Sequence, residues 1–100
     1  MSAIDWNDIA LRCGPSIGSQ RRGVLNISSL GFFVVFVPNT ERARFERDLA
    51  LAGFPIHGIA QYTNEDGEGI FVAVVTADSL EKLRAIVYGK VSRETKAATS

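Results

Sequence analysis

Two apolar runs dominate the pattern of hydrophobic and polar positions, and they begin 38 positions apart in the chain. The first covers Gly31 to Val37 and the second covers Gly69 to Val75. Neither run alternates apolar with polar residues, and both are rich in Phe and Val, a pattern typical of strands buried on both faces. Each run opens with glycine and is followed by a helical pattern. The sequence therefore predicts a duplicated unit around two central strands.

A further strand is expected before each central strand, because a turn signal lies between the two. The segment Val24 to Ser28 is separated from the first central strand by two residues, a spacing that suits a hairpin. The segment Ile56 to Thr63 alternates loosely and leads into Asp66 and Gly67, a strong hairpin turn signal. We therefore expect two hairpins, each of which ends in a central strand.

Helical patterns follow both central strands. Asn39 or Thr40 is expected to cap a first helix that ends at Gly53, and Asp78 is expected to cap a second helix that ends at Gly89. The apolar positions expected to face the core are Ala43, Phe45, Leu49 and Ala52 in the first helix, and Leu80, Leu83, Ile86 and Val87 in the second.

Apolar residues spaced by three and four positions near the N-terminus predict a short amphipathic helix, which Asp5 is placed to cap. We expect the apolar stripe to pack on the core, and Trp6 would be the anchor if the stripe instead met a partner. The stripe consists of Trp6, Ile9, Ala10 and Cys13.

The segment from Gly14 to Gly23 is rich in Gly, Ser and Arg and is expected to form an exposed loop.

These elements predict an α+β fold: a four-stranded, mainly antiparallel sheet from two ββα repeats with a short N-terminal helix (αββαββα). Two helices would cover one face of the sheet and leave the other to the N-terminal helix or a partner. The alternative is a ferredoxin-like βαββαβ arrangement, which needs a last strand after residue 88, where Val91 and its neighbours supply little. We expect residues 1–91 to form a single domain and residues 92–100 a polar C-terminal tail.

Composition narrows the classes of protein. The chain has 100 residues, with 11 basic and 11 acidic side chains and a formal net charge of zero, so no global field attracts nucleic acid or an anionic membrane. Neutrality and a hydrophobic content of 46% favour self-association, and we expect a homodimer. No signal-peptide pattern or membrane-spanning run is expected, and the lone Cys13 suits a reducing compartment, so a cytoplasmic location is expected.

Groups that carry chemistry are scarce. His57 is the only histidine and Cys13 the only thiol, so the chain offers two of the four ligands that a structural zinc site needs. The acidic hairpin with Glu65, Asp66 and Glu68 is too short for a calcium loop, and we expect a solvated hairpin tip, which would also suit a basic partner surface. We therefore expect no enzyme, no catalytic residues, no metal and no cofactor.

The leading functional hypothesis is a non-enzymatic protein-protein interaction or regulatory module, for example a stand-alone inhibitor such as a viral protein that blocks a host factor. One alternative is a small-ligand-sensing regulatory domain, because the paired units resemble those of ACT domains. Another is nucleic-acid binding through an Arg-rich surface. The candidate partner-binding residues are Trp6, Arg21, Arg22, Arg42, Arg44, Arg47, Glu65, Asp66 and Glu68.

The segment Gly31 to Phe36 resembles the RNP1 segment of RNA-recognition motifs, which implies RNA binding through stacked bases. Base stacking needs two aromatic side chains on the same face of the strand, whereas adjacent residues of a strand point to opposite faces. We therefore expect Phe32 and Phe33 to lie on opposite faces, and the resemblance adds little weight to RNA binding.

Overall fold

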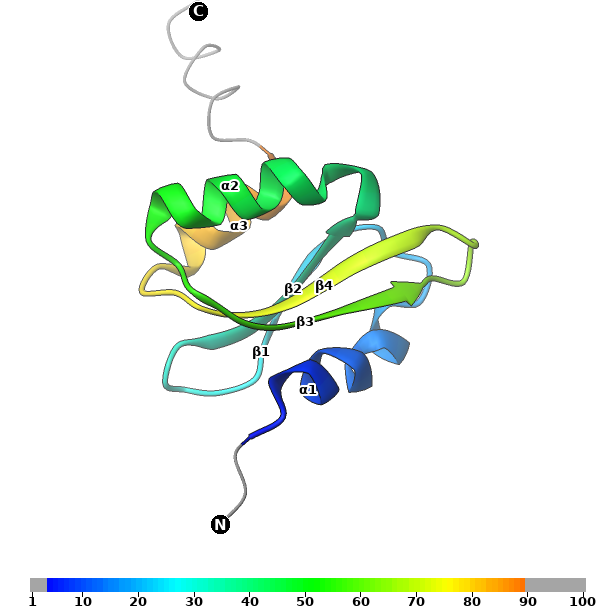
Figure 1. Ribbon diagram of the computed structural model, residues 1–100, viewed down its shortest axis with the longest axis horizontal. Helices are drawn as coiled ribbons and strands as arrows, with labels where there is room; N and C mark the ends of the chain where they lie inside the picture. Colours follow the sequence, from blue (N-terminus) through cyan, green and yellow to red (C-terminus); the bar gives the residue numbers. More distant parts are fainter. Residues whose placement is uncertain (1–3, 90–100) are drawn as a thin grey trace, which may run out of the picture.

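Helices lie on both faces of an antiparallel sheet in the computed structural model, which describes residues 4–89 (Figure 1). The four strands follow the order β1-β2-β4-β3, so the two apolar runs are neighbours at the centre. The predicted α+β fold of two ββα repeats behind a short helix is confirmed. The last strand that the ferredoxin-like alternative needs would lie outside the described residues, and within them β1 forms the edge beside β2. The strands are β1 (Gly23–Asn26), β2 (Phe32–Pro38), β3 (Ile56–Thr63) and β4 (Gly69–Thr76).

Two helices, one from each repeat, cover one face of the sheet, and the N-terminal segment covers the other (Figure 1). The predicted C-terminal tail, residues 92–100, lies outside the described residues. Within residues 4–89, every helix is too short and too polar to cross a membrane. The helices are α1 (Trp6–Arg12), η1 (Gly14–Ile17), η2 (Asn39–Glu41), α2 (Arg42–Ala52) and α3 (Leu80–Tyr88).

The two repeats are related by an approximate two-fold axis that passes between the central strands. Val35 of β2 lies opposite Ala73 of β4, and these two residues are 38 positions apart, like the two apolar runs. Residues at equal distances on either side of this pair are therefore also matched across the axis. The register of the central strands is thus unchanged when the two repeats are exchanged, as expected for the duplication that the sequence predicts.

The central strands lack alternation because both of their faces are buried. Phe33 packs under α2 and α3, whereas Val34, one residue later, belongs to the cluster on the α1 face. Phe32 stacks on Trp6 of α1, so Phe32 and Phe33 lie on opposite faces, as predicted. A strand covered from both sides has no reason to carry polar residues at every second position.

The second face of the sheet is more fully covered than the sequence suggested. The segment Gly14 to Gly23 was expected to be an exposed loop, but Ile17 is 0% exposed and packs with Phe36. The reason is η1: its tight turn directs Ile17 under the sheet, and a Cβ on Gly14 would overlap the ring of Tyr62. The exposed part of this segment is therefore limited to Pro15, Ser16 and the three residues from Ser19 to Arg21.

The starts of both helices differ from the prediction. Ser79, rather than Asp78, caps α3, since its hydroxyl oxygen accepts a hydrogen bond from the Lys82 N–H at 3.2 Å. Helix α2 begins only after η2 and has no side-chain cap, so neither Asn39 nor Thr40 caps it.

Strand β1 is shorter than predicted and ends at Asn26, because the Asn26 Oδ1 accepts a hydrogen bond from the Ser28 N–H and the chain turns there.

The buried faces of the helices are narrower than the periodicity indicates. Ala43 and Ala52 are exposed on α2, and Leu80 is 43% exposed at the start of α3. Ala43 and Ala52 lie in the first and last turns of α2, and Leu80 is the first residue of α3. Gly53 and Gly89 end the two helices in the left-handed region, as expected. The predicted core positions that are buried are Phe45, Leu49, Leu83, Ile86 and Val87.

Helix α1 approaches β3 closely, and a glycine makes the approach possible. A Cβ on Gly58 would lie 2.5 Å from both the carbonyl carbon and the Cβ of Trp6, and 2.8 Å from the backbone nitrogen of Asn7. The Asn7 side-chain oxygen also accepts a hydrogen bond from the Ile59 N–H at 2.7 Å. The absence of a side chain at Gly58 therefore lets α1 approach β3, and the hydrogen bond between Asn7 and Ile59 joins the two elements.

We expect Gly58→Ala to lower the free energy of unfolding by about 1–3 kcal/mol, because the new methyl group meets backbone atoms that cannot rotate away. Gly69→Ala is the matched control, since its Cβ would meet only the Asn39 Cβ at 3.7 Å. Urea unfolding followed by Trp6 fluorescence measures both. Equal stability of the two variants would contradict the close docking of α1.

Candidate functional site

Two of the candidate arginines converge on one carboxylate. Arg22 donates from both Nη atoms to the Glu41 carboxylate, at 2.8 and 2.6 Å, and Arg44 donates to Glu41 at 2.9 Å. Arg22 also donates to the carbonyl of Val87 at 3.3 Å, and Arg44 contacts Asp48 at 2.9 Å. This network joins the start of β1 to α2 and to the end of α3. Its arginines are engaged in holding the fold together.

The Glu41 carboxylate is the electrostatic centre of this network. The hydrogen bonds from Arg22, together with those from Arg44 and the positive charge of both side chains, hold the pKa of Glu41 below its ordinary value, although partial burial acts in the opposite direction. Glu41 is therefore ionised at neutral pH. Its charge stabilises the native state as long as the pH stays above that lowered pKa.

Of the other candidate arginines, Arg21 and Arg42 lie apart from this network, and Arg47 meets only its outer member, Asp48. Arg21 contacts Glu68 at 3.0 Å beside the β3–β4 hairpin, and Arg47 lies 3.8 Å from Asp48 on the outside of α2. Arg42 lies over the Phe71 ring, 4.6 Å from its centroid, and also contacts Glu46 at 3.5 Å. The structure thus spreads the predicted Arg-rich surface over several separate ion pairs.

The acidic hairpin is organised by the buried side chain of Asn64. Asn64 is buried, and its Oδ1 accepts hydrogen bonds from the backbone N–H groups of Asp66 and Glu68, both at 2.9 Å. The Glu65 N–H donates to the Gly18 carbonyl at 2.9 Å. Of the three predicted acidic residues, Glu68 is the one whose carboxylate meets an arginine, Arg21.

Trp6 lies on the opposite face of the sheet from Arg22 and Arg44. Its ring stacks on Phe32 at a centroid distance of 4.9 Å and lies 5.4 Å from the His57 ring. His57 in turn shares a hydrogen bond with the Thr76 hydroxyl. The half-buried Trp6 therefore anchors α1 to the sheet, and the structure does not bring it together with the other predicted partner-binding residues.

Reactive groups are also separated from one another. Burial raises the pKa of the Cys13 thiol, so that less of the nucleophilic thiolate exists at neutral pH than in an ordinary cysteine. Within residues 4–89, no three His, Cys, Asp or Glu side chains gather as a metal site would need. The two edges of the sheet are the remaining candidate surfaces.

Strand β1 offers an open edge. The Ile27 N–H donates to the Phe32 carbonyl at 3.2 Å, which makes these two residues a hydrogen-bonded pair of the β1–β2 ladder. Because such pairs alternate in antiparallel strands, the backbone N–H and C=O groups of Val24 and Asn26 point away from β2. In the described part of the chain, no strand lies along this outer side of β1.

The opposite edge, formed by β3, is partly occupied. The Asn64 N–H donates to the Glu68 carbonyl, and the same alternation then directs the backbone groups of Ile59 and Gln61 outward. The outward N–H of Ile59 already has a partner, the Asn7 side chain of α1. Helix α1 therefore protects one edge of the sheet and leaves the other without an equivalent cover.

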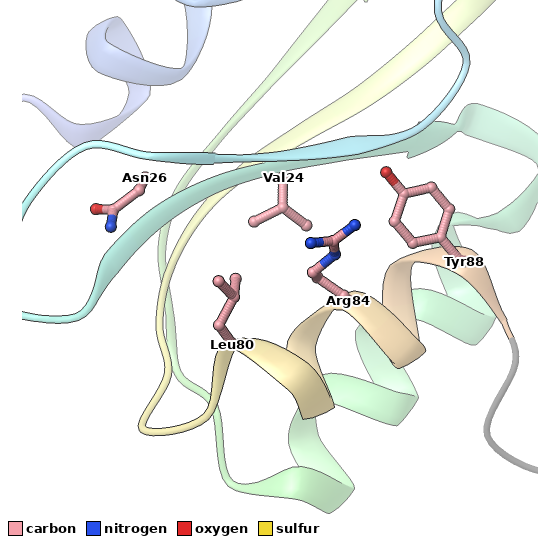
Figure 2. A pocket seen from close by; sticks show the side chains of 5 residues that line it. All are labelled: Val24, Asn26, Leu80, Arg84 and Tyr88. Atoms are coloured by element: carbon pink, nitrogen blue, oxygen red, sulfur yellow. The ribbon is translucent and has the colours of Figure 1, made fainter.

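A shallow groove runs between the open edge of β1 and α3. Its volume is about 200 Å³, and Figure 2 shows side chains from the strand and the helix pointing toward one another across it. The apolar side chain of Leu80 lies at the Asn26 end, and Arg84 projects toward Val24 in the middle (Figure 2). The groove is lined by Val24, Asn26, Leu80, Arg84 and Tyr88.

Arg84 differs from the other arginines of the described chain. Six of the seven arginines between residues 4 and 89 have a carboxylate oxygen within ion-pair distance, and Arg84 is the one that has none. Its side chain is exposed at the groove. None of the groove residues was among the candidate sites from sequence. The exposed Leu80 follows the helical stripe, so periodicity assigned it to the core.

Comparisons with known proteins add no further constraint: no protein family model, no curated protein and no solved structure matches the chain. The candidate site therefore rests on the geometry of the open β1 edge and its groove.

We expect Glu41→Gln to lower the free energy of unfolding at neutral pH by about 1 kcal/mol, because Arg22 and Arg44 lose their charged acceptor. The lowered pKa of Glu41 sets the sign of the pH dependence: the difference from wild type should shrink as the pH falls through that value and Glu41 becomes protonated. Urea unfolding at several pH values measures it. Glu46→Gln is the control and should show a smaller difference, since Glu46 has a single arginine partner at 3.5 Å.

Proposed function

We propose that this protein is a non-enzymatic protein-interaction module that binds an extended segment of another protein along the open edge of β1. The observation that carries the proposal is the outward direction of the Val24 and Asn26 backbone groups beside a groove. Such an edge pairs with an added strand through main-chain hydrogen bonds, while the groove receives alternate side chains of that strand.

The size and shape of the groove favour a peptide over a metabolite. Small-molecule sites have volumes of about 300–1,000 Å³, and this groove, at about 200 Å³, is smaller and only partly enclosed. The outward backbone groups of β1 beside the groove repeat at the spacing of a strand, and a second strand carries backbone groups at the same spacing. These features support a protein partner over the small-ligand sensor that the sequence left as an alternative.

Nucleic-acid binding receives less support from the charges. A phosphate backbone is held by arginines and lysines that are available on one surface. Here Arg22 and Arg44 are held by Glu41, and Arg21 pairs with Glu68 elsewhere. We therefore keep the protein partner as the proposed function. An inhibitory role is compatible with it, because a segment bound along β1 is withheld from its other partners.

Peptides selected from a display library of short linear sequences test this proposal. We expect Val24→Pro to weaken binding of the selected peptides by about tenfold or more, because proline removes the outward N–H of Val24 and obstructs the added strand. The β1–β2 ladder should remain intact, since this N–H does not point toward β2. Fluorescence anisotropy with a labelled synthetic peptide measures the affinity.

The matched control is Gln61→Pro, which places proline at an outward position of the opposite edge. It should leave peptide binding unchanged, and circular dichroism should show that both variants are folded. The proposal is wrong if no peptide is enriched, or if every enriched peptide binds Val24→Pro as tightly as wild type.

The homodimer expected from neutral charge stays a prediction. We expect multi-angle light scattering after size exclusion to give a mass above that of the monomer at micromolar concentrations, because exposed Leu30 and Leu51 add apolar surface to a chain of zero net charge. The expected mass should fall toward 10.9 kDa on dilution. A constant monomer mass across this concentration range would remove the dimer.

A further inference from the structure

We infer that the segment bound along β1 carries an apolar side chain followed two residues later by an acidic one, and that Arg84 binds the carboxylate. This inference rests on the proposed function, because it assigns the chemistry of the segment that the open edge would receive. Three features of the groove support it: the spacing of Leu80 and Arg84, the direction of α3, and the missing carboxylate partner of Arg84 among residues 4–89.

The spacing of the groove side chains matches that of a strand. Leu80 and Arg84 are four residues apart on α3, so they are separated by about 6 Å along the helix axis. In an extended strand, residues i and i+2 point to the same face and lie about 6.7 Å apart. Two alternate side chains of an added strand can therefore meet Leu80 and Arg84 at the same time.

The direction of α3 sets the order of the two side chains. Arg22, just before β1, donates to the Val87 carbonyl near the end of α3, and Leu80 at its start lies at the Asn26 end of β1 (Figure 2). Helix α3 thus runs opposite to β1. A segment that pairs antiparallel with β1 runs in the same direction as α3 and passes Leu80 first, which places the apolar residue before the acidic one.

The charge of the groove indicates a carboxylate. The other arginines of residues 4–89 each lie near a carboxylate oxygen, whereas Arg84 has no such partner there. A guanidinium group binds a carboxylate with two parallel hydrogen bonds, which gives direction as well as affinity. An aspartate or glutamate on the added strand would supply the acceptor that Arg84 lacks.

A second copy of this chain fits the groove less well than a different protein. If β1 paired with β1 of another copy about a two-fold axis, the Arg84 side chains of both copies would lie beside the same pair of strands. Two like charges beside the same pair of strands repel each other and disfavour the pairing. The occupant is therefore assigned to an acidic, extended segment of a different chain.

Synthetic peptides with blocked ends and a Leu-Thr-Glu core test the assignment, with Leu-Thr-Gln and Leu-Thr-Lys versions as comparison. We expect the Glu peptide to bind wild type about tenfold more tightly than the Gln peptide, and Arg84→Gln to remove this difference. Arg84→Glu should reverse the preference in favour of the Lys peptide. Lys82→Gln, an exposed neighbour on α3 outside the groove, is the matched control and should change nothing.

The outcomes separate this inference from the proposed function. If Val24→Pro abolishes binding but the Glu and Gln peptides bind wild type equally, β1 is the docking edge and the role of Arg84 is wrong. If neither Val24→Pro nor the Arg84 variants affect binding, both proposals fail. A wild-type dimer that becomes a monomer in Val24→Pro would show a second copy on this edge and overturn the assignment of a different chain.

Discussion

The pairing of β2 with β4 is the constraint on which the rest of the structure depends. These two strands carry apolar side chains on both faces, so neither face can be left in contact with water. The two repeats supply α2 and α3, and both of these helices lie on one face. The second face then needs a cover from outside the duplication, and α1 with η1 supplies it through Ala10 and Ile17.

The position of that cover makes the two edges of the sheet unequal. Helix α1 lies over β3, where Gly58 allows contact with Trp6 and Asn7 accepts from the outward Ile59 N–H. Strand β1 lies at the far side of the sheet and has no such cover among the described residues. A nearly symmetric core thus produces an asymmetric surface, and the uncovered edge is where a partner strand has backbone groups to bind.

Much of the fold follows from the sequence because its strongest signals are local or periodic. The two apolar runs, the Asp66-Gly67 turn and the glycines that end the helices all predict elements that the structure contains. The errors have a different origin. Ile17 lies in a stretch with turn composition, and only its long-range contact with the sheet makes it a core residue.

The candidate site could not be predicted from the sequence for the same reason, because it too depends on contacts between distant parts of the chain. Arginines were singled out because they are charged, but whether an arginine is available depends on carboxylates that lie far away in the chain, as Glu41 does from Arg22. The groove joins β1 to α3, which are distant in sequence, and the open edge exists only because β1 is the outermost strand. Helical periodicity assigned Leu80 to the core, whereas in the structure it is 43% exposed and lines the groove.

The approximate two-fold axis gives an internal comparison for the groove. The same offset of 38 residues that relates the strands places Leu80 on Arg42 and Arg84 on Glu46. In the first repeat these positions form an ion pair with each other, and Arg42 also covers Phe71. In the second repeat the equivalent positions hold an exposed leucine and an arginine without a carboxylate, so the polar contact that α2 completes within itself is left open on α3. Both helices contribute side chains to the same core, and they differ at the position where α3 faces the uncovered strand.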